Sequence, residues 1–254
     1  MAAEAMETLE LAGRIIMENG GETYRVEETI TRMGCALGLK RVESFAVPSG
    51  VFVSYRREDG TTETSVVRVR RKGTNLTRVD EVNRISRQVE AREITGAQAL
   101  TRLRHIDRAL PTLPRWVVLL GVAVSSGGFT LMFGGTGLDC LLALIITGLA
   151  QGLTLLMERR QMQGLASSLV GSFLSTLLPT LFYAWTGLGQ VDAIVAGALM
   201  PLLPGLSMTN AVQDTLRGDM VSGVSHAVQA LLTAALVAGG ALMATSLSRM
   251  IGGL

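Results

Sequence analysis

The 254-residue chain has few of the side chains from which catalytic and metal centres are usually built. It contains two cysteines and two histidines, and neither Cys35 nor Cys140 has a second cysteine or a histidine at metal-ligand spacing. The sequence therefore predicts no disulfide, no metal site and no bound cofactor. Because so few histidines leave little material for a catalytic centre, His105 is expected to be a polar residue on a solvated helix face.

Charged residues become scarce after Arg115. Residues 1–115 hold 19 of the 23 Lys and Arg and 16 of the 21 Asp and Glu, which leaves nine charges for residues 116–254. These nine lie between long apolar runs, and a bilayer core of about 30 Å needs roughly 20 apolar residues of helix. A very apolar soluble core is the weaker alternative, because five such runs follow one another. We predict a bundle of five transmembrane helices, at about 116–134, 138–157, 164–186, 191–216 and 222–247.

The flanks of these spans predict an orientation in the inner (plasma) membrane. The first thirty residues contain no apolar signal-peptide region, so the first span is expected to act as the insertion signal. Arg115, Arg159, Arg160 and Arg217 lie on one set of flanks, and Arg249 lies on the other. Because cytoplasmic flanks retain Lys and Arg, we expect a cytoplasmic N-terminal domain and an external C-terminus.

The residues before the first span alternate between helical and strand patterns. Apolar residues recur at helical spacing in 6–16 and 26–37, with Gly38 as the expected C-cap of the second helix. From Val42 the period changes to two, with a hairpin turn at Asp59-Gly60, and two helical segments follow. The predicted layout is a cytoplasmic α+β domain followed by a transmembrane domain, residues 1–112 and 113–254.

A basic run, Arg68 to Lys72, follows the second strand of the hairpin. Such a run is found in proteins that bind nucleic acid or anionic lipid. Acidic residues balance this domain, however, and no stacking aromatic residues interleave with the basic ones. We therefore interpret the run as a solvated strand edge and expect no nucleic-acid partner.

The fourth span is interrupted by Pro201, Pro204 and Gly205, about nine to thirteen residues from its start and therefore near the midplane. Breaks of this kind are tolerated where they face protein or a water-filled cavity. A helix that restarts at the midplane directs its N–H groups and positive dipole end towards an anion such as a carboxylate. The break therefore predicts a binding site for a small carboxylate solute.

Polar residues follow the break at steps of three, four and three, in the order Ser207, Asn210, Asp214 and Arg217, which places them on one helix face. The functional interpretation is a solute-binding stripe in which Asp214 relays a proton or binds a cation. The structural alternative is a helix kinked at Pro201 whose stripe packs against a neighbour, with Asp214 and Arg217 paired at the interface. Arg217 is in addition expected to be an interfacial anchor. Hydroxyl groups at the middle of the first span complete the predicted substrate-binding set: Gly205, Ser207, Asn210, Asp214, Ser125 and Ser126.

Other small residues are interpreted as packing positions. Gly148/Gly152 and Ala235/Gly239 are spaced by four residues, which allows helices in a membrane to approach closely. Pro179 interrupts the third span among several Ser and Thr residues, so more than one span is expected to offer hydroxyls to a shared cavity.

Two stretches, "NGGETYRVEETITRMGCALGL" and "LMPLLPGLSMTNAVQDTLRGD", resemble the N-terminal module of the threonine/serine exporter family. With the layout of an α+β domain before five spans, the resemblance covers essentially the whole chain. It implies secondary export of small amino acids, or of dicarboxylates such as succinate in split members of the family. It also implies coupling to a proton or sodium gradient.

Full-length members of that family carry a second membrane module, whereas this chain stops at Leu254. The resemblance therefore implies either a separate small membrane subunit of about four spans or a homo-oligomer. It also leaves a membrane-anchored hydrolase as the alternative function, with Glu22, Glu27, Ser44 and Ser49 as candidate groups. Because the sequence offers no Ser-His-Asp or Cys-His set, we expect a transporter and not an enzyme. Glu22, Arg25 and Glu27 are then expected to form a cytoplasmic gate.

Overall fold

The computed structural model describes residues 2–70, 73–109, 113–159 and 164–251. The chain divides into two compact units, which we describe separately. The first unit contains residues 1–112 together with Leu206–Val228, and the second contains residues 113–205 and 229–254. The predicted domain boundary lies at residue 112, whereas this division also places residues 206–228 in the first unit. Residues 71 and 72 of the predicted basic run lie outside the described residues.

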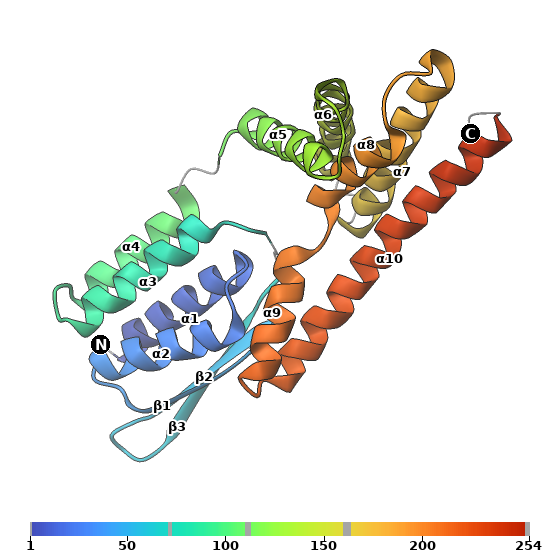
Figure 1. Cartoon of the computed structure of the whole chain (residues 1–254). Helices are drawn as coiled ribbons and strands as arrows, with labels where there is room; N and C mark the ends of the chain where they lie inside the picture. The colour runs from blue at the N-terminus through green and yellow to red at the C-terminus, as the bar shows by residue number, and fades with distance from the viewer. Residues whose placement is uncertain (1, 71–72, 110–112, 160–163, 252–254) are drawn as a thin grey trace. The chain divides into compact units, whose positions relative to one another are not determined.

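The first unit has three layers (Figure 1): a sheet, a pair of helices packed on one of its faces, and a second helix pair packed on the first. The sheet is antiparallel, with strand order β1-β2-β3. The elements are α1 (Ala2–Glu18), α2 (Thr23–Ala36), β1 (Lys40–Val47), β2 (Gly50–Arg56), β3 (Thr62–Arg68), α3 (Leu76–Glu90) and α4 (Gly96–Ala109).

The core of this unit lies between the sheet and the α1–α2 pair. Alternate residues of β2 point to the same face of the sheet, and Val51, Val53 and Tyr55 are buried there against the helices. Leu9 of α1 and Ile30 of α2 fill the helix side of the same core. The strand residues that recur every two positions and the helix residues that recur every 3.6 positions therefore pack against each other in one apolar layer.

Two predicted backbone positions in this unit are confirmed. Gly38 has a φ of 84° just after α2, and its N–H group donates to the Cys35 carbonyl. Gly60 has a φ of 85° in the hairpin turn between β2 and β3. Both conformations are strained for residues with a Cβ atom, which is why glycine ends the helix and makes the turn.

The first unit also contains α9 (Gly205–Leu216) and the first residues of α10 (Met220–Met250). Gly218, with a φ of 89°, ends α9, and the N–H group of Asp219 donates to the Asp214 carbonyl at 2.9 Å, as in a Schellman motif. A Cβ atom at Gly223 would lie 3.2 Å from the Ala211 carbonyl oxygen, so glycine lets α10 return closely along α9.

The second unit is a bundle of apolar helices. Its elements are α5 (Arg115–Met132), α6 (Gly137–Arg159), α7 (Gly164–Thr186), α8 (Val191–Leu199), the 3-10 helix η1 (Met200–Leu202) and the part of α10 after Val228. Predicted spans one, two, three and five match α5, α6, α7 and α10 to within three residues. The fourth is divided into α8, η1 and α9, because the chain breaks between Leu202 and Gly205.

Length and composition support a membrane protein. Within the described ranges, four helices are long and apolar enough to cross a bilayer, namely α5, α6, α7 and α10. A fifth candidate consists of two parts, α8 with η1 and then α9, if these parts are counted as one broken span.

Asp139, at the start of α6, is fully buried and accepts three hydrogen bonds. Its Oδ2 atom accepts from the Thr136 N–H at 2.7 Å and from the Thr136 hydroxyl at 2.8 Å. Its Oδ1 atom accepts from the Gln190 N–H at 2.8 Å. This carboxylate therefore joins the α5–α6 turn to the α7–α8 turn.

Close packing in the second unit depends on glycines other than the predicted ones. A Cβ atom at Gly197 of α8 would collide with Thr130 of α5, and one at Gly240 of α10 would collide with Ser172 of α7. By contrast, a Cβ at Gly152 or Gly239 would meet nothing within 4 Å. The predicted packing role of these two residues is therefore wrong, because four-residue spacing does not say which helix face meets a neighbour.

Candidate functional site

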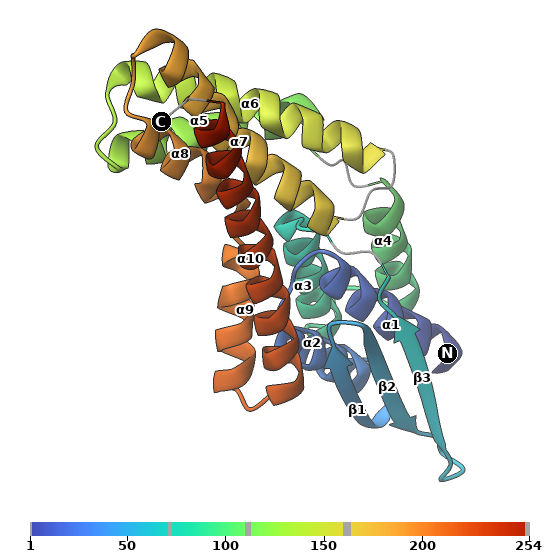
Figure 2. The ribbon, with the colours of Figure 1, turned by 90° about the vertical axis from the view of Figure 1, so that its right-hand side faces the viewer.

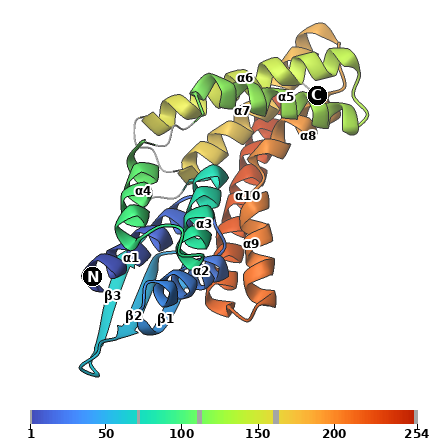
Figure 3. The same ribbon diagram turned by 90° about the vertical axis from the view of Figure 1, so that its left-hand side faces the viewer.

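The polar residues of α9 lie on one face of the helix, as predicted, and this face is buried within the first unit. Asn210 and Asp214 are 6% and 0% exposed, whereas Met208, Val212 and Leu216 are exposed. The hydrogen bond between Asp214 and Thr23 connects this face with α2, and Figure 3 shows the two helices side by side. Ser207 is half-buried, and Gly205 is exposed at the start of the helix.

Asp214 is held by residues from two other helices. Its Oδ2 atom accepts a hydrogen bond from the hydroxyl of Thr23, the first residue of α2, at 3.2 Å. The same oxygen lies 2.9 Å from Nδ1 of His226, on α10. Thr23 is fully buried and the His226 side chain is 12% exposed. The other oxygen, Oδ1, is buried and has no hydrogen-bond partner among the residues that the structure describes.

Two further carboxyl groups lie near Asp214. Asp219 precedes α10, where its Oδ1 accepts from the Ser222 N–H at 3.3 Å, and its Oδ2 is buried without a partner in the described ranges. Glu27, one turn after Thr23, accepts from the Ala46 N–H at 2.9 Å. Burial raises the pKa of Glu27, the Ala46 N–H opposes that rise, and the Asp219 and Asp214 charges add to it. We call Glu27, Asp214 and Asp219 the acidic cluster.

Glu27 and Ser222 also cover the open edge of the sheet. β1 is an edge strand, so half of its backbone groups have no partner strand. At Ala46 both groups are satisfied by side chains: the N–H by Glu27 and the carbonyl by the Ser222 hydroxyl, at 3.4 Å. Figure 2 shows the start of α10 beside this strand. The acidic cluster is therefore anchored to the α+β domain.

The start of α2 carries the predicted gate motif. Arg25 donates from Nε to Glu22 at 2.7 Å, so these two residues form an ion pair. Burial by itself would raise the pKa of Glu22, but the Arg25 hydrogen bond and the positive charges of Arg25 and Arg217 hold it below its ordinary value. Arg217, predicted as an interfacial anchor, stacks on Tyr24 of this helix. Of the three predicted gate residues, Glu22, Arg25 and Glu27, only Glu27 belongs to the acidic cluster.

The hydroxyls of the first span lie in the second unit. Ser125 is exposed on α5, whereas Ser126 is fully buried and shares a hydrogen bond of 2.7 Å with Thr147 of α6. Thr147 lines a crevice of about 10 Å³ where α5, α6, α7 and η1 meet, directly at the helix break. Its other polar lining groups are Gln151 and Ser175, and Pro201 and Leu202 close it. A space of this size holds about one water molecule.

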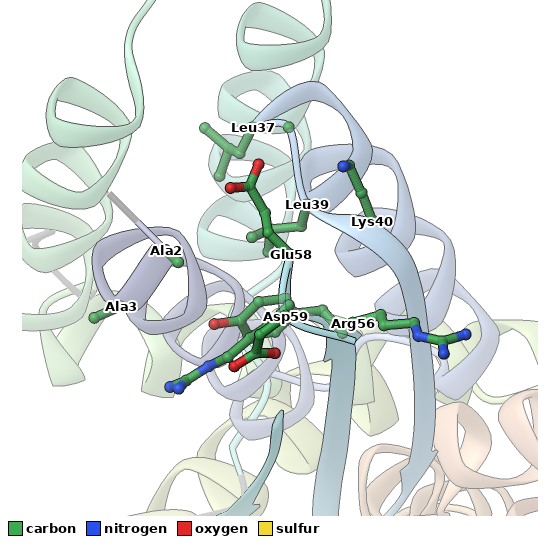
Figure 4. A pocket seen from close by; sticks show the side chains of 11 residues that line it. Ala2, Ala3, Leu37, Leu39, Lys40, Arg56, Glu58 and Asp59 are labelled. Carbon is green, nitrogen blue, oxygen red and sulfur yellow. The ribbon is translucent and has the colours of Figure 1, made fainter. Parts of the chain in front are cut away.

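A wider hollow lies elsewhere on the first unit (Figure 4). It measures about 610 Å³ and lies between the start of α1, the α2–β1 connection and the β2–β3 turn. Lys40, Arg56, Glu58 and Asp59 give it charges of both signs, and the Arg56 side chain extends away from the two carboxylates. None of the residues predicted for the site lines this hollow.

The hydrogen bonds around Asp214 and Ser44 differ from those of a hydrolase triad. In a hydrolase triad the nucleophile bonds to the imidazole, whereas here the Thr23 hydroxyl donates to the Asp214 carboxylate. Within the described residues, His226 accepts no hydrogen bond from a hydroxyl, and the Ser44 hydroxyl donates to the Glu27 carbonyl at 3.3 Å. Nor do these residues contain a group of three or more His, Cys, Asp or Glu that could hold a metal ion.

Sequence reasoning missed four contributors to this site: Thr23, Asp219, Ser222 and His226. Thr23 lies in the "GETYRVEE" stretch, for which the prediction included only the charged residues Glu22, Arg25 and Glu27. His226 is one of only two histidines, and it lies twelve residues after Asp214 on what the sequence presents as the next span. A polar residue near the start of an apolar span is a signal that could have identified it.

Several long apolar helices, a broken helix and a buried polar stripe together define a multi-pass membrane transport protein. Residues 7–248 match a family model whose description reads "Putative threonine/serine exporter". The chain belongs to the threonine/serine exporter family, which confirms the resemblance seen in the two sequence stretches.

Curated relatives carry names of the same kind. The chain is 27% identical over 226 residues to "Probable succinate transporter subunit YjjP" of Klebsiella aerogenes, covering 88% of this chain and 86% of that protein. It is 26% identical over 234 residues to "Probable threonine/serine exporter" of Mycobacterium tuberculosis, covering 91% of this chain and 44% of that protein. The chain thus spans less than half the length of the mycobacterial relative. No solved structure matches the chain.

Proposed function

We propose that the chain is a subunit of an inner-membrane secondary exporter of small amino acids of the threonine/serine type, or of related carboxylates such as succinate. Membership of the exporter family and four to five candidate spans support export across a membrane. The names of the relatives support both solute classes. We further propose that transport is coupled to a proton or sodium gradient.

The observation that carries the proposed binding site is the crevice at the helix break, where three polar residues lie among apolar ones. Thr147, Gln151 and Ser175 converge there from α6 and α7, and Ser126 holds the Thr147 hydroxyl in place. Gly205 begins α9 three residues after Leu202. From the sequence pattern we also propose that the first turn of α9, Ser207 and Asn210 take part in solute binding.

We propose alternating access as the transport mechanism. Sites for small molecules usually measure a few hundred Å³, whereas this one measures about 10 Å³. A threonine or succinate molecule can enter only when the helices that meet at Pro201 separate. The proposed exporter therefore alternates between this closed arrangement and arrangements open to one side of the membrane.

We propose that the N-terminal domain is cytoplasmic and the C-terminus external, as the arginine distribution predicts. We also propose that a second small membrane subunit completes the transporter. The word "subunit" in the name of the Klebsiella relative and the greater length of the mycobacterial one support this assignment. A homo-oligomer is the alternative assembly.

The test is solute flux in everted membrane vesicles from the native host, so that any partner subunit is present. The host lacks its own copy of the gene and carries wild-type chain, Thr147→Val, Gln151→Leu or Asn210→Ala. Wild-type vesicles should accumulate threonine, serine or succinate. Each variant should lose about tenfold or more of that flux, since a buried group left without its polar partner costs roughly 1–3 kcal/mol.

Thr233→Val is the matched control, because its hydroxyl donates to the Gln229 carbonyl of its own helix at 3.0 Å. This variant should transport at the wild-type rate. Membrane insertion is checked for every variant by the amount of protein in the vesicles. Wild-type flux from all three site variants would overturn the proposed site, and absence of flux from wild-type vesicles would overturn the proposed function.

A further inference from the structure

The contact between Asp214 and His226 places two ionisable side chains together in a largely buried part of the first unit. Asp214 is 0% exposed, and one of its two oxygens has no partner in the described part of the chain. An ionised carboxylate in such surroundings is costly unless its charge is compensated. The 2.9 Å contact with the imidazole of His226 is the compensation that the structure supplies.

The charges that face this pair come from every element around it. α2 contributes Glu27, and the α9–α10 turn contributes Asp219. Arg217, at the end of α9, is stacked on Tyr24, and Arg25 of α2 is paired with Glu22. The acidic cluster therefore has more acids than bases close to it.

A proton fits this arrangement better than a metal ion does. A metal site needs several ligand atoms directed at one point, and the described residues hold no such group of His, Cys, Asp or Glu. A proton needs only one acceptor, and it can move between Oδ2 of Asp214 and Nδ1 of His226 over a single hydrogen bond of 2.9 Å.

Thr23 connects the charge of this pair to the N-terminal domain. Its hydroxyl donates to the same Oδ2 atom that contacts His226. An ionised carboxylate oxygen accepts both hydrogen bonds, whereas a protonated Oδ2 is itself a donor and loses acceptor capacity. Thr23 is the first residue of α2, so protonation weakens the contact that holds the start of α2 on α9.

We propose that Asp214 and His226 form the proton-binding site of this transporter and that Thr23 transmits its occupancy to α2. Uptake forms one O–H or N–H bond on the pair while one O–H bond of a hydronium ion breaks and leaves water, and release reverses both changes. The charge of the pair rises by one on uptake. The inference rests on the proposed export function and adds to it the coupling ion and its site.

The experiment separates coupling from solute binding in the same everted vesicles. Net uptake driven by an imposed pH gradient requires the proton site, whereas exchange of internal for external solute without a gradient does not. Asp214→Asn should lose gradient-driven uptake by about tenfold or more and keep exchange within about twofold of wild type. Asn210→Ala, a proposed solute-binding variant, should lose both.

His105→Gln is the matched control for His226→Gln, because His105 is the other histidine and is exposed on α4. His105→Gln should behave as wild type, and His226→Gln should lose gradient-driven uptake while keeping exchange. Gradient-driven uptake that persists in Asp214→Asn would overturn the proton site. So would loss of exchange together with uptake, because that result assigns Asp214 to solute binding.

If wild-type vesicles transport nothing, the proposed function fails, but the Asp214–His226 proton site can still be tested. A double-mutant cycle of Asp214→Asn and His226→Gln is then measured by thermal unfolding of the purified full-length chain, at about pH 5.5 and pH 8, where imidazole charge differs. A coupling that is at least about tenfold stronger at the lower pH, or about 1.4 kcal/mol, supports the proton site. An equal coupling at both pH values overturns it.

Discussion

The guanidinium group of Arg217 lies over the ring of Tyr24, with Cζ 3.5 Å from the ring centroid. Tyr24 is the second residue of α2, and Arg217 directly follows α9. A cation over an aromatic face is attracted by the ring quadrupole, and the contact joins the helix after the break to the α+β domain. It lies at the same end of α2 as the Thr23–Asp214 hydrogen bond.

Tyr24→Ala should therefore loosen α9 from α2 and destabilise the first unit by about 1 kcal/mol, a usual value for an exposed cation–π pair. Tyr24→Phe keeps the ring and should stay close to wild type. The melting temperature of the full-length chain in detergent measures both effects. Equal melting temperatures for all three proteins would show that the stacking contributes no stability.

Glu27→Gln should change how stability depends on pH. The pKa of Glu27 is raised from its ordinary value of 4.5, so between 4.5 and its folded-state pKa the folded chain binds more protons than the unfolded chain. The stability of the wild type should fall as pH rises through that window. Gln cannot ionise and still accepts from the Ala46 N–H, so the variant should have a flatter profile and a higher melting temperature near neutral pH. A steeper profile in the variant would contradict the assignment.

Adjacent glycines of α10 should respond in opposite ways to the same substitution. Gly240→Ala places a methyl group against Ser172 and the Leu169 carbonyl of α7, and we expect a loss of about 1–3 kcal/mol. Gly239→Ala meets nothing within 4 Å and should be neutral or slightly stabilising, because alanine favours helix. Thermal unfolding of the two variants in detergent makes the comparison. A larger loss for Gly239→Ala would mean that the opposite face of α10 meets α7.

Asp139→Ala should destabilise the second unit by about 3 kcal/mol, because three hydrogen bonds to a buried carboxylate are lost together. Asp192→Asn is the control, since Asp192 is exposed in the first turn of α8. The melting temperature and the amount of protein in the membrane report the difference. Wild-type stability of Asp139→Ala would show that other contacts hold the two turns together.

The fold could be predicted from the sequence to a large extent, because local patterns determine most of it. Alternation of period two gave the strands, helical spacing gave the helices, and Gly38 and Gly60 marked the ends of elements. The apolar runs placed four of the five predicted spans to within three residues. Each of these features depends on residues close in sequence, so a single chain is enough to identify it.

The candidate site could be predicted only in part. The break and the buried face of α9 follow from local spacing, but the partners of Asp214 do not. Thr23 is 191 residues away and His226 is on a different helix. Hydrophobicity also assigned all of 206–228 to the membrane domain, although these residues belong with the α+β domain. Composition reports how apolar a helix is and does not report which neighbour covers its polar face.

Of the three places where the chain passes from one unit to the other, one falls in a continuous helix and one in a broken helix. α10 runs without interruption from Met220 to Met250 and crosses the boundary after Val228, whereas α8 and α9 are separated at the boundary after Gly205. An unbroken helix resists bending, whereas a helix interrupted by proline and glycine bends easily. From His226 to Gly240, α10 is about 21 Å long at 1.5 Å per residue. The histidine that contacts Asp214 and the glycine that packs on α7 are therefore residues of the same unbroken helix.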